Sequence, residues 1–221
     1  MNYLSHFIID HTADDVYFNS ALILPDITKR WVKTFNHPPP SNDFTPNQHS
    51  LLRGCLRHYQ RDKQFHGSSF FEGYQQRVNE YLKTQPFSVD VNRKWFIAHV
   101  LTELLIDRAF VKTFPGYVDA FYGSLTAMED RELAGFLKQY GMADTTDFFY
   151  FFNHFRSVQY IYYYADNNKF LYSLTRIMLR VGLKELNAAD AQLMLEAIQY
   201  LELTYMHNGE ALLAELKDVF N

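Results

Sequence analysis

Histidines followed four residues later by an acid are the most unusual chemical pattern in this sequence. Two residues at this spacing share one face of a helix, with their Cβ atoms about 5–6 Å apart. The 9 His and 25 Asp plus Glu in 221 residues predict about one such pair by chance. The sequence contains more than that: His6/Asp10, His11/Asp15, His58/Asp62 and His99/Glu103.

Two of these pairs extend by a further helical turn, to His66 in one case and to Asp107 in the other. The second stripe lies in the apolar segment WFIAHVLTELLID, where titratable groups are costly unless they are paired or bind a metal. Imidazole and carboxylate are ligands for Zn, Mn, Fe and Ni. A divalent ion would activate water and hold phosphate oxygens. The alternative is that each pair forms a buried hydrogen bond or a surface ion pair.

Asp26 and a row of arginines add to this pattern. Asp26 follows Pro25 in the segment SALILPDITKRW, where a helix break would either direct the carboxylate into a cleft or use it as a cap. Basic side chains beside His58 would suit a phosphate or an acidic partner, although a solvated helix face explains them equally well. These side chains repeat at helical spacing: Arg53, Arg57 and Arg61.

The aromatic tract FFYFFNHFRSVQYIYYY occupies residues 148–164. Its polar interruptions exclude a membrane span. Core packing or a subunit interface, which would make the protein a homodimer, is the leading interpretation. A lining for an apolar or pantetheine-like ligand is the alternative. Cys55 is the only cysteine, so no intramolecular disulfide can form, and its apolar neighbours predict a buried thiol.

Composition limits the classes of protein that fit. The net charge of −4, with 21% charged residues, argues against a general nucleic-acid-binding surface. No uncharged apolar run approaches ~18 residues, so no membrane span is expected. The segment 1–10 lacks the basic region of a signal peptide. We therefore expect a soluble cytoplasmic protein.

The chain is predicted to be all-α, a single-domain multi-helix bundle over residues 1–221. Alternating strand patterns are absent, and turn-forming residues separate long helical stretches. The clearest loop is the Pro-rich segment 36–47. We expect helices over these ranges: 14–35 with a kink at Pro25, 48–64, 68–84, 90–113, 116–140 capped by Gly141, 145–165, 168–182, and 187–219 with Asn187 as N-cap and a break near Asn208–Gly209.

Several segments, taken in order, resemble the bacterial acyl carrier protein phosphodiesterase family. The opening MNYLSHF resembles the start of that family and ends near His6. SALILPDI resembles its small-apolar stretch ending in an aspartate, here Asp26. RGCLRHYQRD resembles its motif of Gly, His and Asp. FIAHVLTELLID matches the position of an Asp-His pair, and LTRIMLR matches a Leu, Met and Arg pattern.

The resemblance implies an HD-domain-like helical fold and a metal-dependent phosphodiesterase. The substrate would be a phosphopantetheine linkage, and the partner would be acyl carrier protein. One divalent ion, Mn, Fe or Zn, would be the cofactor, with Arg57 and Arg61 holding the phosphate. The implied metal ligands are His6, Asp26, His58, Asp62 and His99.

The chain departs from the family pattern at two positions and in the Pro-rich loop at 38–40. Ala98 replaces the aspartate before His99, and His66 stands where the family has an acid. Glu103, or Asp107 on the same helix face, would then replace the missing aspartate, and Glu103 and His66 are the expected catalytic groups. The alternative function is a catalytically inactive helical binding protein that kept the scaffold.

Overall fold

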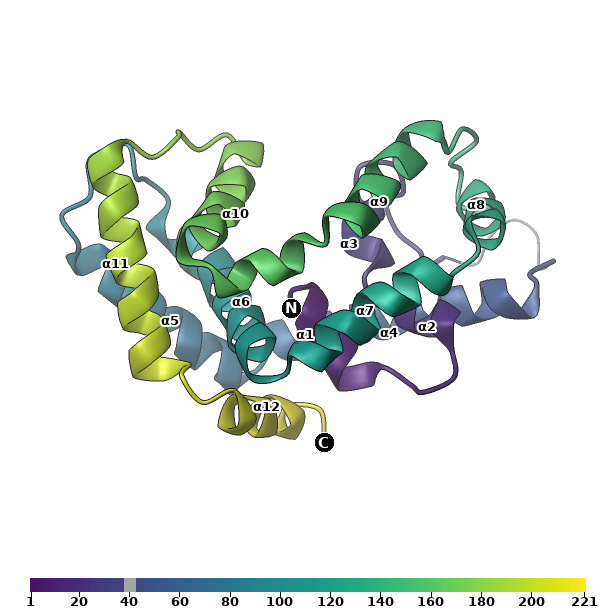
Figure 1. Ribbon diagram of the computed structural model, residues 1–221, viewed down its shortest axis with the longest axis horizontal. Coiled ribbons are helices and arrows are strands. Elements are labelled where there is room, and N and C mark those ends of the chain that lie inside the picture. The colour runs from purple at the N-terminus through teal and green to yellow at the C-terminus, as the bar shows by residue number, and fades with distance from the viewer. Residues whose placement is uncertain (38–42) are drawn as a thin grey trace. The chain divides into compact units, whose positions relative to one another are not determined.

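The computed structural model describes residues 1–37 and 43–221, and within these ranges it contains helices and no strand (Figure 1). This confirms the all-α prediction. Residues 38–42 of the predicted Pro-rich loop lie outside the described residues. The elements are α1 (Tyr3–Asp10), α2 (Val16–Ala21), α3 (Leu24–Thr28), α4 (Pro46–His66), α5 (Ser69–Thr84), α6 (Lys94–Thr113), α7 (Pro115–Ala127), α8 (Asp130–Gln139), α9 (Thr146–Val158), the 3-10 helix η1 (Tyr160–Ala165), α10 (Asn167–Arg180), α11 (Ala188–Tyr205) and α12 (Gly209–Asp218).

Contacts between Cα atoms divide the chain into two compact units. Unit 1 comprises Met1, residues 3–63 and residues 116–160. Unit 2 comprises Asn2, residues 64–115 and residues 161–221. Two such units can belong to one domain or to two, so the single-domain expectation stays a prediction. Among the described residues, no helix combines the length and the apolarity that a membrane crossing requires.

A glycine explains how α4 packs against α2 in unit 1. A Cβ atom at Gly54 would lie 2.4 Å from the Phe18 carbonyl oxygen and 2.6 Å from the Ala21 Cβ. Real Cβ atoms do not approach so closely, so only glycine permits this contact. The close approach places the next turn of α4, which carries His58, beside the end of α2.

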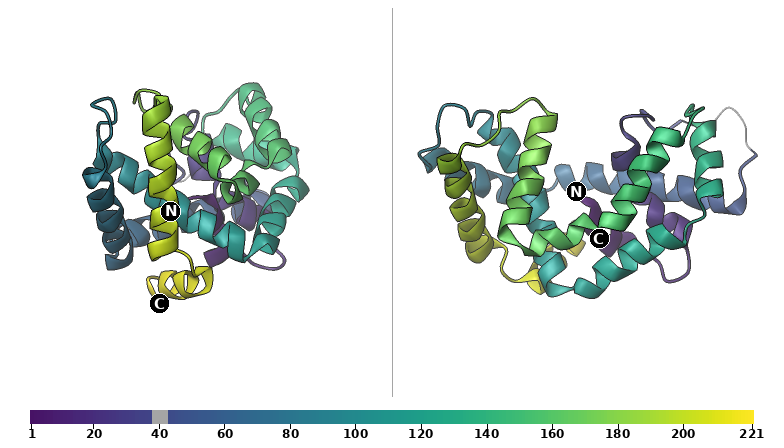
Figure 2. Two further views of the ribbon diagram at one scale, coloured as in Figure 1. Left: turned by 60° about the vertical axis from the view of Figure 1, so that its left-hand side comes forward. Right: turned by 45° about the horizontal axis from the view of Figure 1, so that its top comes forward.

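Unit 2 is built around α6, which contacts α5, α10, α11 and α12 (Figure 1). Twelve of the twenty α6 residues are buried, because neighbouring helices cover several sides. A turn joins α11 to the last helix, α12, at the yellow end of the ribbon (Figure 2). The first residue of α12 is Gly209. A Cβ atom there would lie 2.2 Å from Thr113 Oγ1, so this glycine lets α12 begin directly against α6.

Many predicted helix ends agree with the structure because local signals set them. Ser68 caps α5 by accepting a hydrogen bond from the Phe71 amide at 3.2 Å. Asn187 caps α11 through the Asp190 amide at 2.9 Å. Gly141 follows α8 with a φ of +90°. The break near Asn208–Gly209 is also confirmed, with Asn208 capping α12.

Other predicted helix ranges were wrong. The helix over 14–35 is instead α2 and the short α3, followed by residues 29–35 outside any helix. Pro25 does not kink a long helix; it lies in the first turn of α3, where its missing N–H is tolerated. The range 116–140 is two helices, because Glu129 is extended.

The remaining differences come from left-handed residues. The helix expected from residue 90 begins only at Lys94, after Arg93, whose φ is 49°. The helix over 145–165 ends at Val158, because Gln159 adopts a φ of 51°, and η1 follows. Neither residue is a glycine, so the sequence carries no clear signal for these ends.

Candidate metal centre

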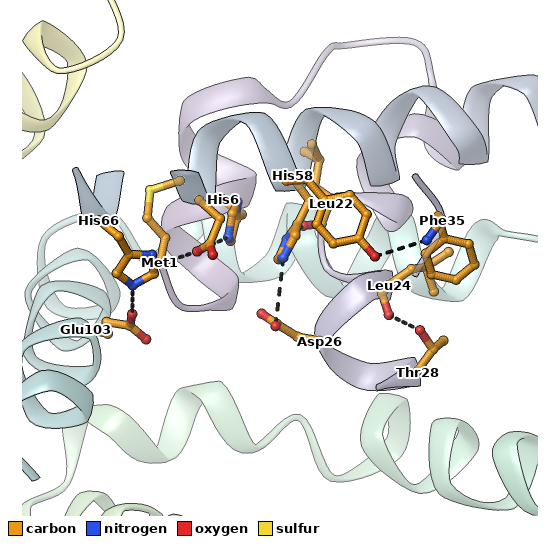
Figure 3. Close-up of polar contacts among 12 residues, drawn as sticks. Met1, His6, Leu22, Leu24, Asp26, Thr28, Phe35, His58, His66 and Glu103 are labelled. Atoms are coloured by element: carbon orange, nitrogen blue, oxygen red, sulfur yellow. Dashed lines mark hydrogen bonds and ion pairs between the residues drawn. The ribbon is translucent and has the colours of Figure 1, made fainter. Parts of the chain in front are cut away.

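Three helices of unit 1 bring His6, Asp26 and His58 together (Figure 3). His6 comes from α1, Asp26 from α3 and His58 from α4. Their ligand atoms all lie within 4.8 Å of one another. Atoms on opposite sides of one zinc-sized ion are about 4 Å apart, so a small side-chain adjustment would let all three bind one cation.

The hydrogen bonding of His58 determines which ring nitrogen can bind a metal. Nδ1 lies 2.8 Å from the Leu22 carbonyl oxygen, which can only accept, so Nδ1 carries the proton and donates. In the neutral ring, Nε2 is therefore the nitrogen with the lone pair. It lies 3.8 Å from Asp26 Oδ1, as Figure 3 shows. A backbone carbonyl that orients an imidazole in this way is typical of metal-binding histidines.

His6 and His58 form the buried side of the group, and Asp26 forms its exposed side. The two imidazole rings stack with their centroids 4.0 Å apart. The His6 side chain is fully buried and that of His58 is 4% exposed, whereas the Asp26 side chain is 34% exposed. A cation held here would be bound from the interior and would remain open to solvent beside Asp26.

Asp62 lies next to this group without forming part of it. Its Oδ1 is 3.9 Å from His6 Nε2 and accepts a hydrogen bond from the Met1 backbone nitrogen at 2.6 Å. Three of the five expected ligands thus converge in unit 1, and Asp62 adjoins them through His6. The fifth, His99, belongs to unit 2.

The two arginines expected to hold phosphate contact Asp10. The Arg61 guanidinium donates to both oxygens of Asp10, with Nε–Oδ2 at 3.0 Å. Arg57 Nη1 lies 3.8 Å from Asp10 Oδ1, and its side chain is 37% exposed. Arg61 therefore joins α4 to the end of α1, while Arg57 is the more accessible cation. Their predicted role in substrate binding stays a prediction.

His66, His99 and Glu103 form a second group, in unit 2. His66 Nε2 is 2.8 Å from Glu103 Oε1, and His99 Nε2 is 3.4 Å from the same oxygen. The ligand atoms of these three residues also lie within 4.8 Å of one another. The catalytic roles expected for Glu103 and His66 stay predictions.

Burial and hydrogen bonds act in opposite directions on the pKa of Glu103. Burial disfavours the charged carboxylate and would raise the pKa. Hydrogen bonds from His66 and His99 are among the interactions that lower it, and the net pKa lies well below the ordinary value. Glu103 is therefore an anion at neutral pH.

The structure assigns structural roles to other residues that the sequence singled out. His11 Nδ1 contacts the Phe7 carbonyl at 3.1 Å, while Asp15 caps α2 and pairs with Arg53 at 2.6 Å. Cys55 is fully buried, as predicted, and burial raises the pKa of its thiol well above the ordinary value. Asp107 is fully buried in α6.

The aromatic tract packs one face of α9 into unit 1. Phe148, Phe152 and Phe155 are buried, and Phe148 stacks on Phe152 with centroids 5.4 Å apart. Tyr150, on the other face, is 84% exposed. Core packing accounts for the buried face, and the homodimer stays a prediction.

Sequence reasoning missed two parts of the first group. The Leu22 carbonyl that orients His58 has no sequence signal, because any residue at a helix end offers a carbonyl. The steric role of Gly54 has a weak signal, since a glycine inside a helical pattern often marks a close helix contact.

The chain matches no protein-family model, no curated protein and no solved structure.

Proposed function

We propose that unit 1 holds a divalent metal ion and that the protein is a metal-dependent phosphodiesterase. The observation that supports this most strongly is the convergence of His6, Asp26 and His58 from three helices, with the tautomer of His58 set by a backbone carbonyl. Two imidazoles and one carboxylate are a common ligand set for transition metals. Placing two imidazoles in the interior side by side is costly unless something compensates, and a cation would do so.

Each residue has a distinct role in the proposal. His6 and His58 bind from the buried side, Asp26 binds from the rim, and Asp62 contacts His6 and helps to orient it. A bound divalent ion supplies an activated water and neutralises charge on phosphate oxygens. The Leu22 carbonyl accepts a hydrogen bond from Nδ1 of His58, so Nε2 is the nitrogen that would bind the ion.

The resemblance noted in the sequence supports the substrate class. It suggests an HD-like fold and the phosphopantetheine linkage of acyl carrier protein, an acidic partner. Two exposed cations, Lys29 and Arg30, follow Asp26 within four residues, and Arg57, whose side chain is 37% exposed, precedes His58 in the chain. These cations suit both a phosphate and an acidic surface.

Hydrolysis of bis(4-nitrophenyl) phosphate by the full chain tests the reaction class. The protein is first freed of metal with a chelator and then loaded with Mn²⁺, Fe²⁺ or Zn²⁺. We expect turnover that depends on metal, and we expect His58→Ala and Asp26→Asn to reduce it by at least ~100-fold, because each removes a ligand. Release of phosphopantetheine from holo acyl carrier protein, followed by mass spectrometry, tests the substrate.

His49→Ala is the matched control, because His49 lies on the same helix as His58 and is exposed. It should keep both turnover and metal. Full metal-dependent turnover by folded His58→Ala protein would rule out this assignment, and so would an absence of metal-dependent turnover in the wild type with all three ions.

A second candidate is a binding protein without catalytic activity, which Ala98 favours. This residue is fully buried in α6 and offers no ligand atom where the resembling family has an aspartate. In this case the chain would form a stable complex with holo acyl carrier protein, which sizing chromatography would detect, and would leave the phosphodiester intact.

A further inference from the structure

The group of His66, His99 and Glu103 in unit 2 is arranged differently from the group in unit 1. His66 is the last residue of α4, and His99 and Glu103 lie one turn apart on α6. Both histidines direct Nε2 toward the same oxygen, Glu103 Oε1, at 2.8 Å and 3.4 Å. Adjacent ligands of a six-coordinate ion at ordinary metal–ligand distances are about 3 Å apart, so this spacing suits neighbouring positions around one cation.

The imidazole rings are held by packing as well as by Glu103. They are almost parallel, with an interplanar angle of 8° and centroids 5.0 Å apart. The ring of Phe71 meets both of them edge-on, at 4.9 Å from each. Phe71 is buried in the first turn of α5, the helix that packs most extensively on α6. Ligand positions set by rigid helices and an aromatic wall need little rearrangement to bind a metal.

Exposure leaves room for further ligands. The side chains of His66 and His99 are 30% and 34% exposed, and that of Glu103 is 18% exposed. Two histidines and one carboxylate are the ligand set that binds Fe²⁺ and similar ions with positions left open for other ligands.

We propose that His66, His99 and Glu103 form a second divalent transition-metal site, in unit 2, which binds its ion independently of the site in unit 1. Metal binding at Nε2 of His66 displaces the proton from that nitrogen, and in a neutral imidazole the ring then carries its proton on Nδ1. The alternative is a triad in which Glu103 only accepts hydrogen bonds from the two histidines.

Cobalt(II) titration of the full chain separates these two cases. Bound Co²⁺ is counted by equilibrium dialysis with elemental analysis, and its visible absorption reports nitrogen and oxygen ligation. In a His58→Ala background, which removes a ligand of the first site, we expect one Co²⁺ per chain. Adding His99→Ala or Glu103→Gln should weaken this binding by more than the ~10–100-fold cost of losing an outer-shell partner.

Control variants separate loss of this metal site from nonspecific binding and from loss of the fold. His207→Ala removes an exposed imidazole from the same unit and should leave Co²⁺ binding unchanged. Glu103→Gln keeps the shape of the side chain, and circular dichroism confirms that each variant is helical. Binding of Co²⁺ that persists unchanged in folded His99→Ala and Glu103→Gln proteins would overturn the proposal, as would the absence of bound Co²⁺ in the His58→Ala background. Failure of the unit 1 site alone would leave this result unaffected.

Discussion

Arg108 shows how unit 2 accommodates a fully buried charge. Its guanidinium donates to Glu202 at 2.9 Å, to the Tyr164 carbonyl at 2.5 Å and to Asn167, and it lies over the ring of Phe170. A buried charge with this many partners links elements that are distant in sequence. The sequence placed Arg108 in an apolar helix without revealing any of its partners, since all of them lie more than fifty residues away.

Asp190 makes stability depend on pH in a direction that can be tested. Hydrogen bonds from the side chain and the backbone amide of Ser88 lower the pKa of Asp190. Because the folded pKa is lowered, the carboxylate stabilises the fold above its unfolded pKa, and this contribution is lost as the pH falls through the folded pKa. Asp190→Asn should therefore be less stable than wild type at pH 7, and the difference should shrink in acid.

Urea unfolding at a series of pH values measures this difference. Asp144→Asn changes an exposed loop aspartate whose pKa is lowered mainly by local hydrogen bonds from Thr146. It serves as a comparison, because this carboxylate joins no distant segments. A stability difference between wild type and Asp190→Asn that stays constant from neutral to acidic pH would contradict the prediction.

Among the elements, α4 carries a strict steric requirement at Gly54. The Gly54→Ala change would place a methyl group against the Phe18 carbonyl and the Ala21 side chain, so α4 and α2 must separate. Overpacking of this kind costs about 1–3 kcal/mol. We expect a corresponding loss in the free energy of unfolding, together with weaker metal binding in unit 1, because His58 lies one turn further along α4.

Gly73→Ala is the matched control for this change. Gly73 also lies inside a helix, and a Cβ atom there would meet nothing within 4 Å. Alanine should stabilise that helix by up to about 1 kcal/mol. Denaturant unfolding of both variants gives the comparison, and equal effects of the two alanines would show that the contact at Gly54 is not limiting.

The sequence predicted helix ends well where a local signal sets them. Ser68, Asn187 and Gly141 act through their own side chain or φ angle, so three or four neighbouring residues suffice. It failed where the backbone adopts a conformation that its residue types do not favour. Arg93 and Gln159 take positive φ values that depend on tertiary packing, and no short-range pattern reveals them.

The candidate sites were also predicted in part, where the signal is local, and missed where it depends on tertiary packing. The pattern of histidines and acids at helical spacing identified every histidine of the two groups, because residue types are read directly from the sequence. Among the described residues, His99–Glu103 is an i, i+4 pair that also forms an ion pair. Members of the other pairs take partners from separate helices, as when Arg61 of α4 pairs with Asp10 of α1. Residue spacing is read within one helix at a time, so it cannot show which helices contact one another.

At the scale of the whole molecule, the described residues of each unit form one candidate metal group. Unit 1 holds a group with a buried pair of imidazoles, and unit 2 holds one that is about one-third exposed at its histidines. Composition offered no hint of this division, because both units have the same helical character and no Gly- or Ser-rich linker separates them.

Beyond its first three residues, the chain passes from one unit to the other after Lys63, after Pro115 and after Tyr160. Neither unit is therefore a continuous stretch, and each combines residues from both halves of the chain. If the chain is divided after Phe114, between α6 and α7, each unit consists of a piece from each fragment. We expect the two fragments to be poorly helical alone and to regain helicity on mixing, as circular dichroism would show. Helicity that does not increase on mixing would contradict this. The protein is thus suited to split-protein complementation, in which reassembly of two polypeptides restores both units at once.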